Sequence, residues 1–496
     1  MQLDFLPEPA LEFGGGMSHI DIRFGLMQYG PLDITSELAP RRIKVGVVGT
    51  PAGTEMLREW LERCRAEIGA RESRQRNLFP RFPGFAEDVA FGSTLVLSDE
   101  TTRTIADRFF DALRQGSANE AIQGAVDLFL QECRVLSHDH RVDVVVCVVP
   151  MRIAELMDPA LRDTRTPSAE NDDAEAIRDD ADERDLLALN FRDLLKAKAM
   201  GVARLNTPIQ LILPSSLNPT LGRKLKIREN ETRSVQDEAT RAWNFHTALY
   251  YKAGGRPWRI PRDPRQFTTC HVGISFYESL DRRAILTSMA QVFDERGDGV
   301  VVRGGPIQMS KDDRVPHLTA LDSEALLMRA LARYRDVHKN APARVVVHKS
   351  SPHSLAELEG FDAAATRANI EVVDCVSIGR RPTTRLFRYG NYPPLRGTYL
   401  HLDARDHLLY TRGSVNFFET YPGSYVPRPL LFRCDRVEST PKHIAREMLG
   451  LSKLNWNVTQ FDGGTPITIE AARRVGKILK HLGDDDLVGH QYAFYM

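Results

Sequence analysis

The stretch Leu249–Ile260 reads LYYKAGGRPWRI and marks the junction between two differently patterned halves of the chain. Lys252 falls at the end of a predicted helix, and Gly254 and Gly255 can adopt the left-handed backbone conformation that ends a helix. Pro257 follows and cannot continue the helix, because proline lacks a backbone N–H and clashes with the preceding turn. The string therefore predicts a capped helix that leads into a new domain.

Before this junction, β-branched runs alternate with helical patterns. Strands that alternate with helices form parallel βαβ units, and nearly continuous apolar strands indicate a sheet covered on both faces. The sequence therefore predicts an α/β fold with a Rossmann-like first domain over residues 1–266. Its expected strands lie at 43–50, 93–98, 142–149 and 209–213, and its expected helices at 56–68, 120–135 and 186–200.

After the junction, the pattern changes to three successive strands of an antiparallel meander, followed by alternating helices and strands. This order is that of an RNase H-like fold, which we assign to a second domain over residues 267–496. The expected strands lie at 271–277, 283–293, 299–303, 343–348 and 370–376, and the expected helices at 322–339, 354–369 and 468–481.

The whole chain carries no net charge, since 66 lysines and arginines balance 66 aspartates and glutamates over 496 residues. Such a balance argues against binding nucleic acid through bulk charge. The stretch 158–185, however, holds eleven acidic residues against four arginines and almost no large apolar side chains, which predicts a flexible, solvated insertion. The rest of the chain therefore carries a matching excess of positive charge.

Basic side chains concentrate in two segments, 223–233 (RKLKIRENETR) and 380–396 (RRPTTRLFRYGNYPPLR). Arginine binds phosphate in a bidentate manner, and aromatic residues in the second segment offer stacking surfaces for unpaired bases. A solvated loop is the alternative for each segment. The positions predicted to line a nucleic-acid channel are Arg223, Lys224, Arg380, Arg381, Arg385 and Arg388.

Cysteine usage and the N-terminus bear on the compartment. Six cysteines are scattered without a C-x-x-C pair, which predicts free thiols in place of disulfides or a zinc site. The first residues, MQLDFLPEPALEF, lack the basic region and apolar core of a signal peptide, and the longest apolar stretch, 142–151, is too short to span a bilayer. We therefore expect a cytoplasmic protein.

Two further strings are weak signals. The glycine-rich run at 46–53 matches neither common phosphate-binding glycine motif, so it predicts a tight structural turn. His138, Asp139 and His140 are adjacent in sequence and lack the spacing of metal ligands on one helix face. Neither string is assigned a ligand.

The string Lys-x-Gly-Gly, placed between a Rossmann-like and an RNase H-like domain, resembles the MID–PIWI junction of Argonaute proteins. Residues 25–32 (GLMQYGPL) resemble the lead-in to the MID region, and residues 451–469 resemble the PIWI segment before the last helix. The chain also ends in an aromatic-rich QYAFYM. Its length leaves no room for the N-terminal and PAZ domains of long Argonautes, so the resemblance is to the short prokaryotic Argonautes.

The resemblance implies a site for the 5′-phosphate of a guide strand. Argonaute MID domains use a Tyr-x-x-x-Lys pair, a Gln and a further Lys, and the matching positions here are Arg192, Lys196, Gln210 and Lys252. Residues four apart share one helix face, and a doubly charged phosphate suits several cations and an amide. The resemblance also implies a structural Mg²⁺ ion at this phosphate, held by the carboxylate of Met496.

The resemblance further implies a PIWI nuclease site that is degenerate here. The family's V-G-I-D string reads VGIS, ending in Ser275, and its V-V-H-R-D string reads VVHKS, ending in Ser350. The last position falls at Ala472. Serine and alanine cannot neutralise two divalent cations, so we expect no target cleavage by this chain. The alternatives are an active RNase H-like nuclease with another carboxylate set, for which Glu278 and Asp374 are candidates, and a Rossmann-type nucleotide-binding enzyme.

Short Argonautes of this kind resemble the sensor half of a defence system. The resemblance implies a guide RNA, a complementary single-stranded DNA target from an invading plasmid or phage, and a separate effector subunit. That subunit carries an APAZ region fused to a TIR, Sir2 or nuclease domain, and it forms a heterodimer with the sensor. Target pairing is expected to activate the effector, with oligomerisation as one route.

Overall fold

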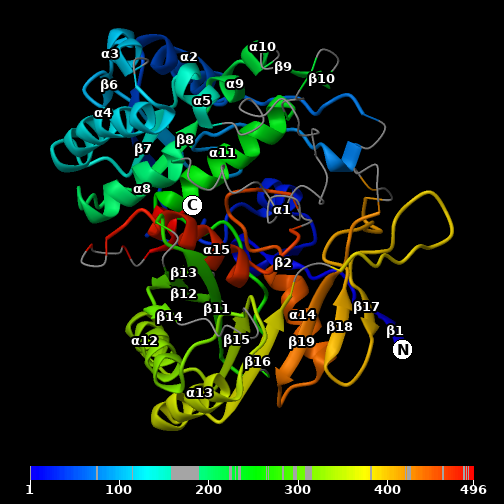
Figure 1. The fold of residues 1–496 in the computed structure, drawn as a ribbon. Coiled ribbons are helices and arrows are strands. Elements are labelled where there is room, and N and C mark those ends of the chain that lie inside the picture. The colour runs from blue at the N-terminus through cyan, green and yellow to red at the C-terminus, as the bar shows by residue number, and fades with distance from the viewer. Residues whose placement is uncertain are drawn as a thin grey trace.

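A computed structural model gives the fold of the chain (Figure 1). The predicted acidic insertion and the channel positions Arg223, Lys224, Arg380 and Arg381 lie outside the residues that the structure describes. The described residues are all except 1, 74–75, 114–115, 158–188, 223–225, 229–230, 233–235, 264, 266, 282–283, 294–298, 308–314, 380–381, 419–420, 422–425, 461–462, 484–485, 487–488 and 490.

The smaller sheet lies in the upper half of the molecule in Figure 1 and has the strand order β5-β4-β7-β8, with β6 also paired to β4. Every pair in it is parallel, which confirms the predicted βαβ organisation. Strand β6 was not predicted from the sequence. The strands are β4 (Arg42–Gly49), β5 (Thr94–Val96), β6 (Thr102–Thr104), β7 (Val144–Val148) and β8 (Ile209–Ile212).

Helices cover both faces of this sheet. Along β7 the side chains alternate, so that Val145 and Cys147 pack with α4 and α8, whereas Val144 and Val146 pack with α2 and α11. The chain begins these helices with polar caps, including a capping box at Ser117 for α4. The helices are α2 (Pro51–Arg63), α4 (Ala118–His138), α8 (Phe191–Gly201) and α11 (Glu238–Lys252).

The larger sheet has the order β1-β17-β18-β19-β16-β15-β11-β12-β13, with β14 paired to β12. Strands β11, β12 and β13 form the predicted antiparallel meander, and β15 and β16 continue the sheet in parallel to β11. The strands are β1 (Gln2–Phe5), β11 (Thr269–Glu278), β12 (Ile285–Phe293), β13 (Gly299–Val302), β14 (Pro306–Ile307), β15 (Arg344–Lys349), β16 (Val372–Ile378), β17 (Thr398–His401), β18 (Asp406–Leu409) and β19 (Leu430–Arg436).

Two helix layers enclose the larger sheet. Val272 and Ile274 of β11 pack with α12 (Ala320–His338) and α13 (Leu355–Ala368), while Gly273 between them faces α15 (Ile467–Leu479). Helix α14 (Pro441–Leu451) packs against β19. The remaining elements are β2 (Leu11–Glu12), η1 (Gly14–Gly16), β3 (Ser18–His19), α1 (Ile22–Tyr29), η2 (Arg76–Leu78), α3 (Asp107–Ala112), α5 (Met151–Met157), α9 (Pro214–Leu217), α10 (Pro219–Gly222), β9 (Lys226–Arg228), β10 (Glu231–Thr232) and η5 (Tyr492–Phe494).

The predicted junction is confirmed as a helix end. Helix α11 ends at Lys252, and Gly254 has a φ of +93°, in the left-handed region that glycine favours. Gly255 is needed for a different reason from the one predicted, because a Cβ there would lie 2.3 Å from the ring of Tyr250. The close approach of this ring fixes the path of the chain as it leaves the helix.

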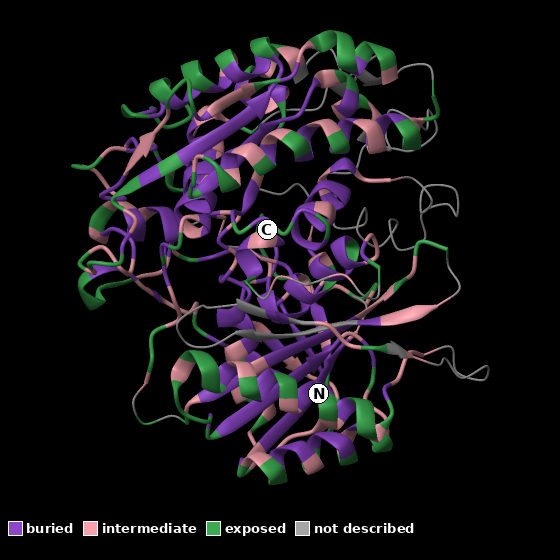
Figure 2. Ribbon diagram, turned by 90° about the vertical axis from the view of Figure 1, so that its left-hand side faces the viewer, coloured by how far each residue is buried: buried purple, intermediate pink, exposed green. Residues whose placement is uncertain are grey.

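The two halves share one hydrophobic core (Figure 2). Trp258 and Trp456 are buried there, and the Tyr251 and Trp456 rings stack with centroids 4.7 Å apart. Both ends of the chain also contact the half of the molecule on the other side of residue 266. Strand β1 pairs with β17 in the larger sheet, and η5 contacts both α11 and β13. The boundary at 266/267 stays a prediction.

Other expectations on the chain concern thiols and membranes. All six cysteines are free and buried, although Cys133 and Cys147 lie with their sulfur atoms 3.7 Å apart. Among the described residues, no helix combines the length and apolar character needed to cross a bilayer.

Thr50 caps α2 by accepting a hydrogen bond from the Gly53 N–H, so the glycine-rich run at 46–53 serves as the predicted strand-to-helix turn.

Candidate anion-binding site

The structure brings together the four predicted phosphate-site positions at the edge where β8, α8 and α11 meet. Lys252 Nζ donates to Gln210 Oε1 at 2.5 Å, to the Ile209 carbonyl at 3.1 Å and to the main-chain oxygen of Met496 at 3.2 Å. Arg192, on α8, donates to the Tyr495 carbonyl at 3.0 Å. Residues up to 304 positions apart in sequence therefore converge, and the chain end closes the site between the two halves (Figure 1).

Arg474, a fifth polar residue that the sequence did not suggest, joins this site from α15. It is held by Glu470 at 2.6 Å, one helical turn earlier. Its positive charge acts on both Lys196 and Lys252, as does that of Arg192. The only sequence signal was the Glu470–Arg474 spacing on the last helix, which by itself indicates an ordinary helix-surface pair.

Both lysines are buried, and among the described residues no Asp or Glu side chain forms an ion pair with either, although the charge of Asp193, which pairs with Arg192, acts on Lys196. Lys196 is 2% exposed and Lys252 is 4% exposed. Within the described parts of the chain, Lys196 Nζ has no hydrogen-bond or ion-pair partner, and Lys252 bonds only to amide and main-chain oxygens. Burial, and then the charges of Arg192 and the neighbouring cations, lower the pKa of both lysines well below the usual value. An anion bound among these groups would raise the pKa of both lysines again and offset the free-energy cost of burying their charges.

This electrostatic arrangement predicts proton uptake when a phosphate binds. In the anion-free protein the lowered lysine pKa favours loss of a proton at alkaline pH, and a phosphate raises the pKa again. At alkaline pH we expect binding of a 5′-phosphorylated oligonucleotide to be accompanied by net uptake of protons. Calorimetry in two buffers of different ionisation enthalpy measures this uptake. A 5′-hydroxyl oligonucleotide should show none, and equal heats in both buffers for the phosphorylated one would contradict the assignment.

The predicted magnesium site is less well matched by these residues. Gln210 Oε1 and the main-chain oxygen O of Met496 both already accept from Lys252 Nζ. Among the described residues there is no group of three or more His, Cys, Asp or Glu side chains suited to a metal. A divalent ion here would stand among cations, so the described set fits a phosphate and does not by itself fit Mg²⁺. Mg²⁺ binding stays a prediction.

The three positions predicted to be a degenerate nuclease site lie on β11, directly after β15 and on α15. Ser275 extends β11 past Ile274, whose carbonyl accepts from the Ser350 N–H at 3.0 Å on the neighbouring strand. Ala472 lies one turn along α15 from Thr468, the residue packed against Gly273. Ser275 and Ala472 are buried. Ser275 and Ser350 therefore lie on neighbouring strands, and Ala472 lies on the helix that packs against β11.

The two alternative carboxylates do not join this cluster. Asp374 is paired in register with Val346, four residues before Ser350 and so about 13 Å back along the strands. It forms an ion pair with Arg344 at 2.6 Å and accepts from Ser439 Oγ at 2.7 Å. Glu278 is exposed at the far end of β11.

Close packing at this edge gives a stability prediction. A Cβ on Gly273 would lie 2.2 Å from the Thr468 carbonyl oxygen, and the backbone of α15 cannot yield cheaply. We expect Gly273→Ala to lower the free energy of unfolding by about 1–3 kcal/mol, as overpacking does. Urea denaturation measures the loss. Gly305→Ala is the matched control, since a Cβ at Gly305 meets nothing within 4 Å; equal losses for both variants would contradict the packing argument.

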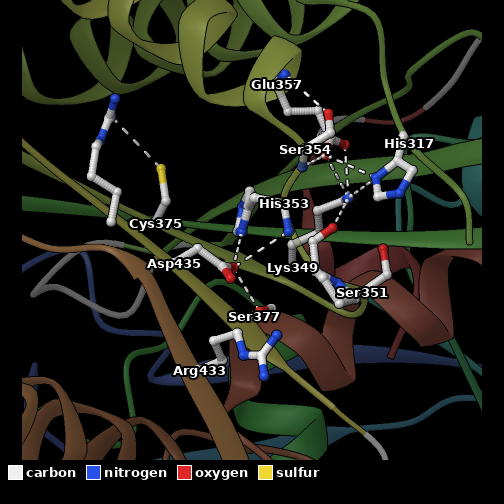
Figure 3. A network of polar contacts seen from close by, with 12 residues as sticks. His317, Lys349, Ser351, His353, Ser354, Glu357, Cys375, Ser377, Arg433 and Asp435 are labelled. Carbon is white, nitrogen blue, oxygen red and sulfur yellow. Dashed lines mark hydrogen bonds and ion pairs between the residues drawn. The ribbon is translucent and has the colours of Figure 1, made fainter. Parts of the chain in front are cut away.

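A buried polar network lies beside Ser350 (Figure 3). Lys349 forms a fully buried ion pair with Glu357 of α13 at 2.7 Å. Asp435 accepts from His353 Nδ1 and from Ser377 Oγ, each at 2.6 Å. These contacts fix the loop that follows β15, which is the loop that carries Ser350.

The described part of the predicted nucleic-acid channel is a projecting surface segment. Arg385 Nε donates to the Val426 carbonyl at 2.8 Å, and Arg388 Nε donates to the Tyr392 carbonyl at 3.2 Å. Phe387 and Tyr389 are exposed, at 77% and 105%. Arg396, at the end of the same basic segment, is instead buried in an ion pair with Glu8. The other basic segment contains the antiparallel pair β9–β10, which the sequence analysis did not predict.

Comparison with known proteins rests on the fold. No protein-family model and no curated protein sequence matches the chain. Among solved structures, Clostridium butyricum Argonaute bound to a guide DNA and a 19-mer target DNA is similar, with a TM-score of 0.63 and 14% identity over 97% of this chain. The chain folds like one half of an Argonaute protein.

Two further Argonaute structures agree with this fold. A. aeolicus Argonaute is 14% identical over 99% of this chain, with a TM-score of 0.55, and Drosophila Piwi is 13% identical over 99%, with a TM-score of 0.56. The chain spans about half the length of these proteins, with 53% of the C. butyricum, 55% of the A. aeolicus and 56% of the Drosophila chain covered. The predicted combination of a parallel, Rossmann-like sheet with an RNase H-like sheet is thereby confirmed as an Argonaute-like α/β fold.

Proposed function

We propose that this chain is a guide-dependent nucleic-acid sensor that holds the 5′-phosphate of a guide strand at Arg192, Lys196, Gln210 and Lys252. The observation that carries the proposal is the buried pair Lys196 and Lys252, which is desolvated and forms no ion pair with an Asp or Glu side chain among the described residues. Burying unpaired cations is costly, and a terminal phosphate offers the charge that compensates them. Arg474 adds a further donor on the side of α15.

The guide is proposed to be RNA and the target a complementary single-stranded DNA of an invader. The fold supports strand binding in general, since the similar C. butyricum Argonaute was solved with a guide DNA and a target DNA. The preference for an RNA guide comes from the resemblance to short prokaryotic Argonautes. Base pairing would read the sequence, while Arg385 and Arg388 of the projecting segment contact phosphates of the paired strands.

The outcome of target pairing is proposed to be activation of a partner. The partner is an effector subunit with an APAZ region and a TIR, Sir2 or nuclease domain, bound to this chain as a heterodimer in prokaryotic defence. Linkage requires that the target bind the active arrangement of this complex more tightly than the resting one. Co-purification from the native host, followed by mass measurement of the second subunit, tests for such a partner.

The sensor role predicts that the purified chain does not cut DNA. Ser275, Ser350 and Ala472 cannot replace a carboxylate cluster that binds two metals. We expect no cleavage of a labelled complementary DNA by the guide-loaded chain with Mg²⁺ or Mn²⁺. Cleavage that Glu278→Ala or Asp374→Ala abolishes would overturn the sensor proposal and favour the alternative, an RNase H-like guide-dependent endonuclease.

The role of Mg²⁺ can be tested on the same complex. If Met496 helped to hold a structural Mg²⁺ ion at the guide phosphate, chelation would weaken only guides with a 5′-phosphate. A Rossmann-type nucleotide-binding enzyme, the third reading of the sequence, would bind its nucleotide equally well after Lys196 and Lys252 are replaced.

A further inference from the structure

Lys196 differs from the other buried lysines in the described part of the chain. Lys349 and Lys453 each pair with a glutamate, and Lys252 donates to three oxygen atoms. Lys196 Nζ has no hydrogen-bond or ion-pair partner among the described residues, and it is not one of the fully buried polar atoms that lack a partner. The amine is therefore held by no acceptor, and it is not sealed from a small molecule that enters the anion-binding site.

The surroundings of Lys196 favour the uncharged amine. Burial is the largest cause that lowers its pKa, and the charges of Arg192 and Lys252 lower the pKa further. Asp193 acts in the opposite direction without cancelling these effects. An uncharged amine has a free lone pair, and a lysine that lies desolvated beside another cation acts as a nucleophile in this form. Lys196 therefore combines an unoccupied nitrogen with the electrostatic environment of a nucleophile.

The same cations attract a reagent that carries a phosphate. Arg192 lies four residues before Lys196 on α8 and shares its face of the helix, and Lys252 approaches from the end of α11. A phosphate held by these two side chains brings any group attached to it toward Lys196 Nζ. In an acyl phosphate, a reactive carbonyl carbon is joined to the phosphate through a single oxygen atom. Such positioning accelerates a reaction, because the two reactants are already in contact.

We propose that Lys196 is a modification site that accepts an acyl group from an acyl phosphate, with acetyl phosphate as the simplest donor. Lys196 Nζ attacks the carbonyl carbon, so that a C–N bond forms and the C–O bond to the phosphate breaks. The departing phosphate takes the proton that the nitrogen loses. The products are N-acetyl-lysine and inorganic phosphate, and the step needs no oxidant, reductant or further reactant. Arg192 and Lys252 stabilise the negative charge of the leaving phosphate.

Acetylation of Lys196 is expected to weaken guide binding, and this consequence rests on the proposed guide-binding function. The acetyl group removes the positive charge of the side chain. We expect the acetylated chain to bind a 5′-phosphorylated guide about tenfold more weakly, which is the loss expected for one charge-assisted contact. A bound guide should in turn protect Lys196 from acetylation. Acyl phosphates would thereby reduce guide loading.

Peptide mass spectrometry of the full chain, after incubation with acetyl phosphate, measures the modification of each lysine. We expect Lys196 to be acetylated at least about tenfold faster than Lys198, because Lys196, unlike Lys198, lies among cations that hold the phosphate of the reagent. Lys198 is the matched control, since it lies on the same helix and pairs with Asp127. Inorganic phosphate should slow the reaction at Lys196 and leave the reaction at Lys198 unchanged.

Two further arms test the role of the phosphate. N-hydroxysuccinimidyl acetate, an acetyl donor without a phosphate, should show no preference for Lys196. Arg192→Met should slow the acetylation of Lys196 by acetyl phosphate, and the competition with inorganic phosphate keeps the test valid if this variant does not fold. Equal rates at Lys196 and Lys198, no protection by inorganic phosphate, or the same preference with the succinimidyl ester would each overturn the proposal.

The same samples separate this proposal from the guide-binding function. If the chain acetylated at Lys196 binds a 5′-phosphorylated guide as tightly as the unmodified chain, the guide-binding role of Lys196 is wrong and the modification site stands. If acetyl phosphate leaves Lys196 unmodified while replacement of Lys196 and Lys252 weakens 5′-phosphorylated guides, the modification site is wrong and the guide-binding function stands.

Discussion

The double variant Lys196→Met, Lys252→Met is expected to weaken binding of a 5′-phosphorylated guide about 100-fold or more, while a 5′-hydroxyl guide of the same sequence loses little. Each charge-assisted hydrogen bond contributes about 1.5–3 kcal/mol, and each 1.4 kcal/mol is a factor of ten in affinity. Methionine preserves most of the buried side-chain volume, so the change removes charge and donors with little loss of packing. Fluorescence anisotropy with the two guides measures the difference.

A neighbouring lysine provides the matched control. Lys198 lies on the same helix, α8, but its Nζ pairs with Asp127 of α4 at 2.7 Å. Lys198→Met should leave the ratio between the two guides unchanged. If the double variant weakens both guides equally, the two lysines contribute general attraction to nucleic acid and the 5′-phosphate assignment is wrong.

The two buried lysines are expected to make the stability of the guide-free protein depend on pH in a defined direction. Burial lowers the pKa of Lys196 and Lys252, so the unfolded chain binds more protons than the folded one at pH values between the lowered and the ordinary lysine pKa. Stability of the guide-free protein should therefore rise with pH across that window. The double methionine variant removes this dependence, which makes the variant at least as stable as the parent when no anion is bound.

The sequence predicted those features that depend on neighbouring residues. The apolar runs that became β4 and β7, the helix end at Lys252 and the meander β11–β12–β13 all follow from local periodicity and from glycine and proline positions. Strand β6, which is three residues long, was missed because so short a run carries no period and is held by its pairing with β4.

The anion-binding site was predicted only in part, because much of it is made by long-range packing. Arg474 enters it only because α15 packs beside α8, which the spacing of residues on α15 does not reveal. Arg396 is a residue that the sequence places at a nucleic-acid surface and the fold does not. It belongs to a basic segment that predicts a nucleic-acid surface, yet it is buried against Glu8, which lies 388 positions away in the sequence. The sequence shows that a residue is charged, but it does not show which residue will pair with it in the folded protein.

The second large effect is expected from Glu357→Ala, which should lower the free energy of unfolding by about 3–5 kcal/mol. Glu357 and Lys349 are both fully buried, and Glu357 also accepts from the Leu318 N–H at 2.8 Å and from the Ser354 N–H at 2.7 Å (Figure 3). Truncation leaves the Lys349 charge in the core with the Pro316 and Pro352 carbonyls and the His317 ring as its hydrogen-bond partners, and with no carboxylate. Urea denaturation at neutral pH measures the loss.

Acid should reproduce part of this effect in the parent protein. Burial alone would raise the pKa of Glu357, but the charge of Lys349 and the hydrogen bonds to Glu357 outweigh it, so the pKa is lowered. The ion pair therefore stabilises the fold at neutral pH, and its contribution is lost as the pH falls from the ordinary glutamate value of about 4.3 through the lowered one. Glu359→Ala, at an exposed position of the same helix, is the control and should change stability by less than about 0.5 kcal/mol. A loss for Glu357→Ala no larger than that of Glu359→Ala would show that the buried pair is not a stabilising contact.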